Sequence, residues 1–498
     1  DVCSSDLLTR LSQVVKWKEV EALFLSRNLE NFTDSCFLFN KLQVCLVIET
    51  VIKKGRKGIM KKLAGKIKHP FIRNVLIMVS GTAAAQVIAM LLSPVITRLY
   101  GPENYGIMGT FVSMIGIFVP VAALTYPIAI VLPEDDRDAR GIAHLSVFVT
   151  LAMTVLSAFI FIIFREPVIE VFNIEEIGSY LFLIPVAIFF GGLLQVMEQW
   201  LIRTKQFQVS ALTSVVQALL VHGGKAGFGF IYPHAPVLVL FSTVQDGLRS
   251  FLMYRLSRRA GKPLTFNLLQ YRPALKKLAK KHYDFPVFRA PQVFLNAVSQ
   301  SIPVLMLTSL FGPAAAGFYS IGRTVLNVPS ALIGKSVGDV FYPRISEAAN
   351  CGEPLTRLVR KATLSLALVG LVPYGLVILF GPWLFAFVFG SEWTLAGEYA
   401  RWLSLWILFA FMNQPSVRAL PVLHAQSFHL VFTIFQLAIR ILALAAGYFL
   451  FKSDLTAVAL YGITGAMLNL LLIVITLRLC GKFDQKREME AAGDERNE

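Results

Sequence analysis

The chain has 498 residues, of which 55% are hydrophobic and only 16% are charged. This composition excludes a soluble domain, whose polar surface would have to cover its core. The net charge of +16 does not indicate binding to nucleic acid, because the Lys and Arg residues lie at the ends of apolar segments and in alternate loops.

The first 59 residues contain no methionine and lack the basic, apolar and small-residue order of a signal peptide. Met60 is followed by a cluster of lysines and then by the first apolar segment, which is the usual start of a membrane protein with a cytoplasmic N-terminus. We therefore interpret residues 1–59 as an atypical N-terminal extension that is non-native or dispensable. The alternative is an amphipathic surface segment around Phe37 to Ile52.

Apolar stretches of about 20 residues, each able to cross a bilayer as a helix, recur from Val75 to Leu479. The predicted spans are 75–96, 107–131, 141–164, 180–201, 208–230, 236–256, 289–311, 318–341, 362–380, 396–420, 428–450 and 456–479. Loops rich in Lys and Arg alternate with loops rich in Glu, so the basic loops and both chain termini are predicted to be cytoplasmic. The predicted fold class is an all-α membrane protein with about 12 transmembrane helices.

A sequence repeat divides these spans into two sets of six. Leu99-Tyr100-Gly101-Pro102-x-x-x-Gly106 recurs as Leu310-Phe311-Gly312-Pro313-x-x-x-Gly317, and two later landmarks keep nearly the same spacing. Because six is an even number, both copies enter from the same side and form parallel lobes. The predicted domains are an N-terminal lobe at 60–256, a basic cytoplasmic linker at 257–288, a C-terminal lobe at 289–480 and a cytoplasmic tail at 481–498.

Three passages resemble one known family: Leu91 to Gly109, Phe285 to Tyr319, and Tyr319 to Glu347. They are similar to the polysaccharide transporter family of oligosaccharide flippases, which includes O-antigen and capsule translocases. That family lies in the superfamily of multidrug exporters and the lipid II flippase. The resemblance runs from about Lys61 to Gly481. It implies an undecaprenyl-pyrophosphate-linked sugar as cargo, carried from the cytoplasmic to the periplasmic face of the bacterial inner membrane.

Ionisable residues inside predicted spans are candidates for function, because a charge in hydrocarbon needs a cavity or a partner. The basic candidates for a substrate cavity are Arg440, Lys225, Arg249, Arg323 and Arg418. A cationic cavity suits a pyrophosphate that must cross a region of low dielectric constant. Arg440 lies nearest the middle of its span and is the strongest candidate.

The basic candidates also have structural interpretations. Arg440 could be a structural link between neighbouring helices. Asp246 precedes Arg249 by three residues, and Asp339 follows Lys335 by four, so both cations could pair within one helix. Arg323 could extend toward the interface. Arg418 lies near the cytoplasmic boundary, where interface anchoring explains it.

Lys225 follows His222, Gly223 and Gly224, which suggests a loosened helix beside the cavity. Polar uncharged residues on the spans could hydrogen-bond sugar hydroxyls or neighbouring helices. They are Gln86, Gln195, Asn296, Gln300, Asn413, Gln414 and Gln436.

Glu198 and Asp246 are the candidates for coupling transport to an ion gradient. ATP hydrolysis is not expected, because Gly334-Lys335-Ser336 lacks the earlier glycine of a phosphate-binding loop. The five cysteines form no metal-binding or disulfide pattern, so neither a metal nor a cofactor is expected.

The sequence leaves three functions open. The first is a flippase for lipid-linked oligosaccharide, a non-enzyme whose partners are its cargo, membrane lipids and, as a candidate, polysaccharide assembly machinery. The second is an exporter of drugs or small metabolites, and the third is a polysaccharide polymerase. A polymerase would need a large periplasmic loop, which the predicted topology does not provide.

Overall fold

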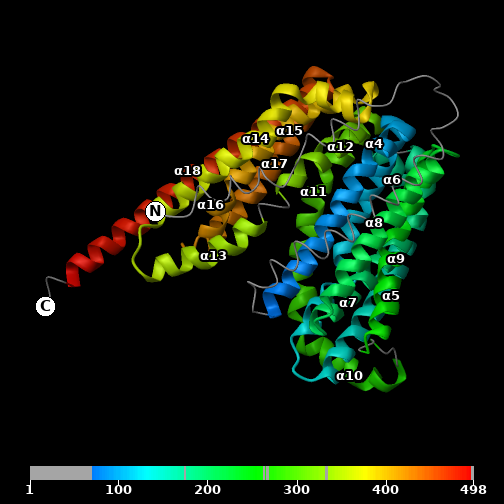
Figure 1. The fold of residues 1–498 in the computed structure, drawn as a ribbon, viewed down its shortest axis with the longest axis horizontal. Helices are drawn as coiled ribbons and strands as arrows, with labels where there is room; N and C mark the ends of the chain where they lie inside the picture. Colours follow the sequence, from blue (N-terminus) through cyan, green and yellow to red (C-terminus); the bar gives the residue numbers. More distant parts are fainter. Residues whose placement is uncertain (1–69, 173–174, 262–263, 265–267, 331–334, 495–498) are drawn as a thin grey trace, which may run out of the picture. The chain divides into compact units, whose positions relative to one another are not determined.

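A computed structural model describes residues 70–172, 175–261, 264, 268–330 and 335–494 (Figure 1). The chain divides into two compact units, Asp1–Arg73 and Asn74–Glu498. The first unit lies almost wholly outside the described residues, and with it the predicted extension 1–59 and the predicted start at Met60. All of the following concerns the second unit and the helix that leads into it.

The described residues are helical, with short turns and no strand between the helices. The first half of the chain forms α4 (Pro70–Phe118), η1 (Val119–Val121), η2 (Tyr126–Val131), α5 (Asp136–Ile163), α6 (Arg165–Phe172), η3 (Glu175–Leu183), α7 (Ile184–Arg203), α8 (Phe207–Gly229) and α9 (Ala235–Arg259). The second half forms α10 (Leu268–Lys281), η4 (Phe285–Arg289), α11 (Ala290–Phe311), α12 (Pro313–Pro329), α13 (Lys335–Asn350), α14 (Leu355–Phe389), η6 (Ser391–Trp393), α15 (Thr394–Met412), α16 (Gln414–Ala419), α17 (Gln426–Phe451) and α18 (Asp454–Asp494).

Seven helical segments of the described residues are long and apolar enough to cross a membrane. Helices α8, α9 and α15 fall outside this group, and each carries charged residues such as Lys225, Asp246 and Arg401, which lower its hydropathy. The finding confirms an all-α, multi-pass membrane protein. The count of about 12 spans and the cytoplasmic termini stay predictions.

The sequence repeat is also a repeat of backbone geometry. Gly101 interrupts α4 with φ 71° and ψ 172°, and Gly312 separates α11 from α12 with φ 88° and ψ 173°. An L side chain is strained at such φ values, so glycine is needed at both turns. Pro102 and Pro313 follow, each at a helix start where no backbone N–H has to be bonded.

The two Gly-Pro turns pack against each other. A side chain on Gly106 would meet the backbone of Pro313 and Gly317, and one on Gly317 would meet the backbone of Pro102. We call this contact of Pro102, Gly106, Pro313 and Gly317 the glycine seam. It joins α4 of the first half to α12 of the second at a distance that only glycine permits.

Polar contacts reinforce the joint between the halves near the glycine seam. The Thr110 and Thr308 hydroxyls lie 2.5 Å apart in a buried hydrogen bond. Arg98 donates to the Phe387 carbonyl at 2.8 Å, and the indole of Trp393 donates to the Thr97 carbonyl at 3.2 Å. The halves are therefore held together by specific hydrogen bonds at this end.

The buried hydrophobic residues form several separate cores. Near the glycine seam, one core combines residues of both halves, including Tyr100, Tyr319 and Trp393. A second core, around Phe111 and Ile184, also includes Leu305 of α11 and so combines both halves. Two other cores follow: one contains Trp200 with the linker residue Phe285, and the other gathers α13, α14 and α18 around Leu355. Among the described residues, the halves thus share hydrophobic core near the seam and along α11.

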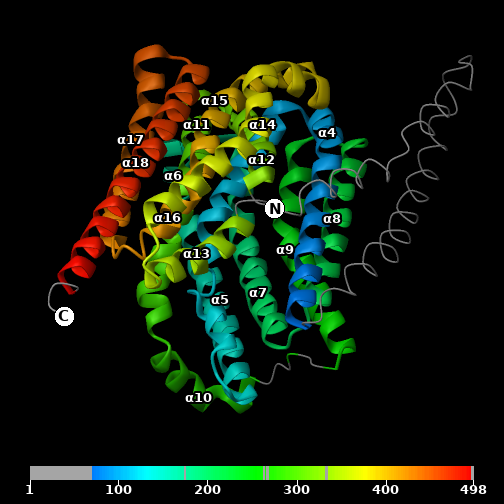
Figure 2. The same cartoon turned by 60° about the vertical axis from the view of Figure 1, so that its left-hand side comes forward.

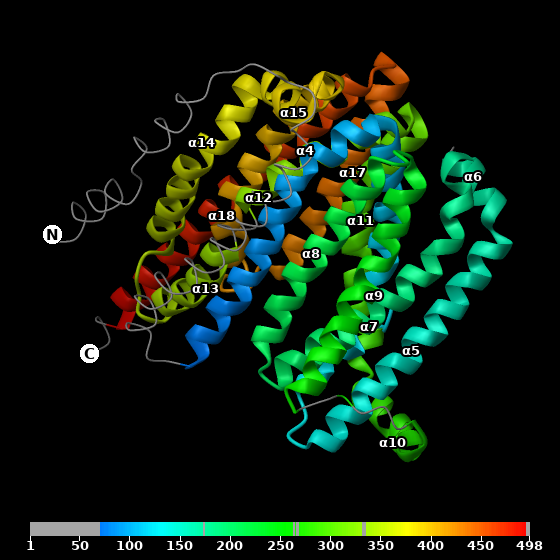
Figure 3. The same cartoon turned by 45° about the vertical axis from the view of Figure 1, so that its right-hand side comes forward.

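The linker and the tail are helical and attached to opposite halves. Within the predicted linker 257–288, α10 packs against α5 (Figure 2). The predicted tail 481–498 continues α18 as far as Asp494, alongside α14 (Figure 3). There the Asp484 carboxylate accepts from the backbone N–H groups of Leu355 at 2.9 Å and Thr356 at 3.0 Å. Asp484 therefore caps the start of α14 from a distant part of the chain.

Candidate functional site

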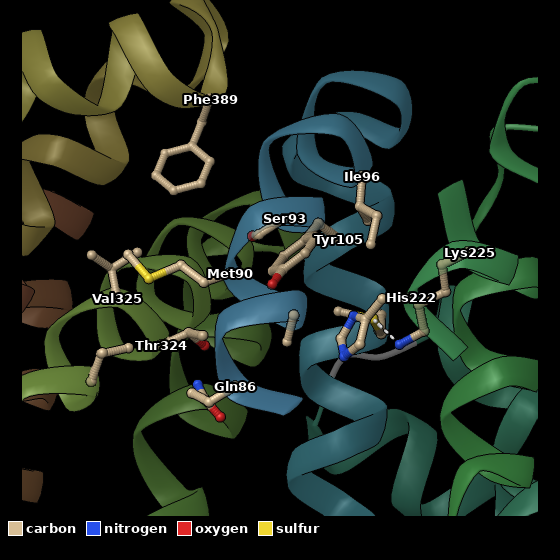
Figure 4. Close-up of a pocket in the computed structure, with 13 residues that line it drawn as sticks. Gln86, Met90, Ser93, Ile96, Tyr105, His222, Lys225, Thr324, Val325 and Phe389 are labelled. Atoms are coloured by element: carbon tan, nitrogen blue, oxygen red, sulfur yellow. Dashed lines mark hydrogen bonds between the residues drawn. The ribbon is translucent and has the colours of Figure 1, made fainter. Parts of the chain in front are cut away.

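A cavity of about 80 Å³ lies between the two halves. Helices α4 and α8 form one side and α12 and α14 the other, with His222 and Lys225 across from Thr324 and Val325 (Figure 4). The lining residues are Gln86, Ala89, Met90, Ser93, Ile96, Tyr105, Met108, His222, Lys225, Thr324, Val325, Val328 and Phe389. An apolar wall with a few polar groups is typical of a ligand-binding site.

Lys225 is the cation of this cavity. Its side chain is only 6% exposed, and its ammonium donates to the Ser242 hydroxyl at 2.9 Å and to the Met108 sulfur at 3.5 Å. The ion pairs found among the described residues do not include Lys225. A buried ammonium without a carboxylate favours a negatively charged ligand, which would neutralise it.

Helix α8 is intact around Lys225, so the loosened helix suggested by Gly223 and Gly224 is wrong. The glycines serve packing instead, because a side chain on Gly224 would collide with the ring of Phe241 from α9. Helix α9 consequently approaches closely and places Ser242 against the Lys225 ammonium.

A second pocket of about 270 Å³ adjoins the cavity. The two share Gln86, Ala89 and His222, so they are continuous along α4 and α8. The other polar residues of the second pocket are Thr82, Ser214, Gln217, Gln245 and Arg249. Amide groups at this density can donate to and accept from sugar hydroxyls.

Arg249 pairs with a different helix than the sequence suggested. Its guanidinium contacts the Glu198 carboxylate of α7 at 3.0 Å, so the intrahelical pair expected with Asp246 is not the ion pair observed. Arg249 pairs with Glu198 instead of Asp246 because α7 and α9 pack side by side. The Nε atom of Arg249 remains buried without a hydrogen-bond partner among the described residues.

The other predicted intrahelical pair joins Lys335 and Asp339. The side chains of both residues lie outside the described part of the structure.

The remaining basic candidates lie on the second half. Arg323 donates to the backbone carbonyl and the side-chain oxygen of Gln300 on α11. Arg418 is exposed on the short helix α16, as expected for a residue that anchors an interface. Arg440 of α17 lies between the rings of Trp406 and Tyr461. The structure thus brings Lys225, Arg249 and Glu198 together around the two pockets and sets Arg440 apart from them.

Residues 95–397, more than half of the chain, match the family described as polysaccharide biosynthesis protein. The chain belongs to this family. The resemblance to polysaccharide transporters given by the Gly-Pro turns is thereby confirmed.

Solved structures share the fold of this polysaccharide biosynthesis protein. An inward-facing multidrug resistance transporter of the MATE family, in the MOP superfamily, has a TM-score of 0.66 at 14% identity, over 80% of this chain and 96% of its own. The lipid II flippase MurJ, in an inward closed conformation, has a TM-score of 0.60 at 14% identity, over 82% and 90%. No curated protein matches the sequence. The fold is therefore one of membrane transporters and flippases.

Several residues of the site in this polysaccharide biosynthesis protein escape sequence reasoning. Tyr105, Gln217 and Gln245 line the pockets although the pattern of apolar segments does not single them out. The sequence does show them as polar residues within or near predicted spans. It does not show which face of each helix lines the cavity, because that depends on how the two halves pack.

Proposed function

We propose that this polysaccharide biosynthesis protein is a flippase that carries an undecaprenyl-pyrophosphate-linked oligosaccharide from the cytoplasmic to the periplasmic leaflet. The observation that carries the proposal is the buried, carboxylate-free ammonium of Lys225 in a cavity between two halves. Family membership limits the function to polysaccharide biosynthesis, and the transporter fold favours movement of a lipid-linked sugar over catalysis.

The proposed topology has 12 spans in two parallel lobes, with both termini in the cytoplasm of a bacterial inner membrane. The positive-inside rule supports this orientation. The glycine seam then faces the periplasm, and the Arg249 pocket opens toward the cytoplasm. Because the halves are joined at the seam, we interpret the structure as a state open to the cytoplasmic side.

In the proposed mechanism, the pyrophosphate enters between the halves and approaches Lys225, whose ammonium supplies the opposite charge. Gln86, Gln217 and Gln245 hydrogen-bond the first sugars, while the lipid chain stays in the bilayer. The glycine seam then separates as the opposite end closes, and the headgroup meets the periplasm.

Arg249 and Glu198 provide a proposed route for coupling. A phosphate at Arg249 would displace the Glu198 carboxylate, which would then need a proton or a cation as a new partner. Asp246, one turn before Arg249 on α9, is the second carboxylate able to respond.

The test is reconstitution of the full chain in liposomes that carry a labelled lipid-pyrophosphate oligosaccharide in the inner leaflet. Appearance of the label on the outer leaflet above protein-free liposomes supports the proposal. A parallel assay offers a cationic drug to the same liposomes. Export of the drug without movement of the labelled lipid would replace the flippase by the exporter.

A further inference from the structure

Arg440 lies against two aromatic rings. Its guanidinium carbon lies 3.7 Å from the centroid of the Trp406 ring of α15 and 3.9 Å from that of the Tyr461 ring of α18. The two rings meet edge to face, with centroids 5.5 Å apart and planes at 78°, so they flank the cation on adjacent sides. The N–H donors lie along the edge of the planar guanidinium.

That edge has unmet hydrogen-bonding capacity. The Nε and Nη2 atoms of Arg440 are shielded from solvent and have no acceptor among the described residues. The ion pairs of the described residues do not include Arg440. Buried donors on a cation call for an acceptor that carries negative charge.

The surroundings of Arg440 repeat those of Lys225 in the other half. Lys225 contacts Met108, seven residues after Gly101, and the corresponding position after Gly312 is Tyr319. Lys225 also contacts Ser242, the eighth residue of α9, and the eighth residue of α18 is Tyr461.

The two cations themselves lie on α8 and α17, the helices that precede α9 and α18. Counted from the helix starts, Arg440 lies one turn before the position of Lys225. Each half thus presents a buried cation on corresponding helices, against corresponding residues.

The two positions differ in the chemistry they favour. An ammonium is a point charge that suits any phosphate oxygen, whereas a guanidinium edge suits two oxygens of one planar or tetrahedral oxyanion.

We propose that Arg440, Trp406, Tyr461 and Tyr319 form a second oxyanion site in the C-terminal half. It binds a carboxylate of an acidic sugar or a phosphoryl group of the cargo. This proposal rests on the proposed function, because it assigns the ligand to the cargo of the flippase. It narrows the substrate class to lipid-linked oligosaccharides that offer two separated anionic groups, one for each half.

Binding to the purified full chain in detergent tests the site without requiring transport. The probes are a disaccharide that contains glucuronate, its neutral glucose counterpart, and inorganic pyrophosphate, titrated by calorimetry. Arg440→Gln is expected to weaken binding of the recognised anion about ten- to a hundredfold, the effect of losing a charged hydrogen bond. Arg440→Lys is expected to weaken binding of the anion as well, because the two parallel N–H donors of the guanidinium are lost while the charge remains. Arg360→Gln, an exposed arginine on α14, is the matched control.

The outcomes separate the sources of the anion. Loss of glucuronate binding in Arg440→Gln assigns the site to an acidic sugar, and loss of pyrophosphate binding assigns it to a phosphoryl group. Unchanged affinity for both probes in a folded Arg440→Lys protein overturns the site. A failed flipping assay with intact, Arg440-dependent binding would reject the transport function and leave the oxyanion site standing.

Discussion

Lys225 combines full burial with contacts only to a hydroxyl and a thioether, a combination that lowers the stability of the folded protein. A charge that destabilises the fold is expected to be retained for function. The apolar wall of the cavity strengthens its attraction for an anion, because little water screens it.

Replacing Lys225 by methionine tests this interpretation at the level of one residue. Lys225→Met keeps the length of the side chain and removes the charge, so we expect at least a tenfold loss of flipping, about 1.4 kcal/mol or more. The thermal midpoint should be unchanged or higher, since a buried charge is gone. Lys361→Met, at an exposed lysine of α14, is the control. Wild-type flipping by Lys225→Met would remove Lys225 from the site.

Sequence reasoning identified charged residues within spans but not their partners. The hydropathy pattern alone identifies Lys225, Arg249 and Arg440, since each interrupts an apolar run. The pairing of Arg249 with Glu198 depends on how α7 packs on α9, and the rings around Arg440 come from two other helices. Such contacts join residues far apart in the chain, which a local pattern does not encode.

At the level of elements, the glycine seam couples the two halves through direct backbone contact. A methyl group at Gly106 would overlap the Pro313 carbonyl, and backbone atoms cannot move aside as a flexible side chain can. The sequence predicted the Gly-Pro turns at Gly101 and Gly312, and the structure adds the role of Gly106 and Gly317 in the close approach of α4 and α12.

We expect Gly106→Ala to force the seam apart and to lower the thermal midpoint, with a cost of about 1–3 kcal/mol for overpacking. Gly227→Ala is the matched control, because a side chain there meets nothing within 4 Å. In α8 that change should be neutral or stabilising, by up to about 1 kcal/mol. Equal thermal midpoints for the two variants would mean that the seam is looser than described.

The contact between α18 and α14 makes a separate prediction. Asp484→Ala removes both acceptors at the start of α14 and should cost about 0.5–2 kcal/mol, read as a lower midpoint of thermal unfolding in detergent. Gln485→Ala, the exposed neighbour, should leave the midpoint unchanged. A midpoint for Asp484→Ala equal to that of Gln485→Ala would show that the cap contributes nothing.

At the level of the whole molecule, two similar halves share a core at one end and enclose a cationic cavity between them. The membrane class and the repeated Gly-Pro turn were predictable, because hydropathy and glycine chemistry are local. The exact helix ends were not. The predicted break near residue 100 is a single glycine within α4.

The central claim is that the two ends open in alternation around the cargo. Pulsed electron paramagnetic resonance can measure the two distances. One spin-label pair is placed at Glu103 and Glu392 near the glycine seam, and another at Arg137 in the first turn of α5 and Lys482 in α18; all four positions are exposed. In liposomes that contain lipid-linked oligosaccharide, the account predicts a population in which the seam distance lengthens while the other shortens. Distances that stay fixed, or that lengthen and shorten together, would contradict it.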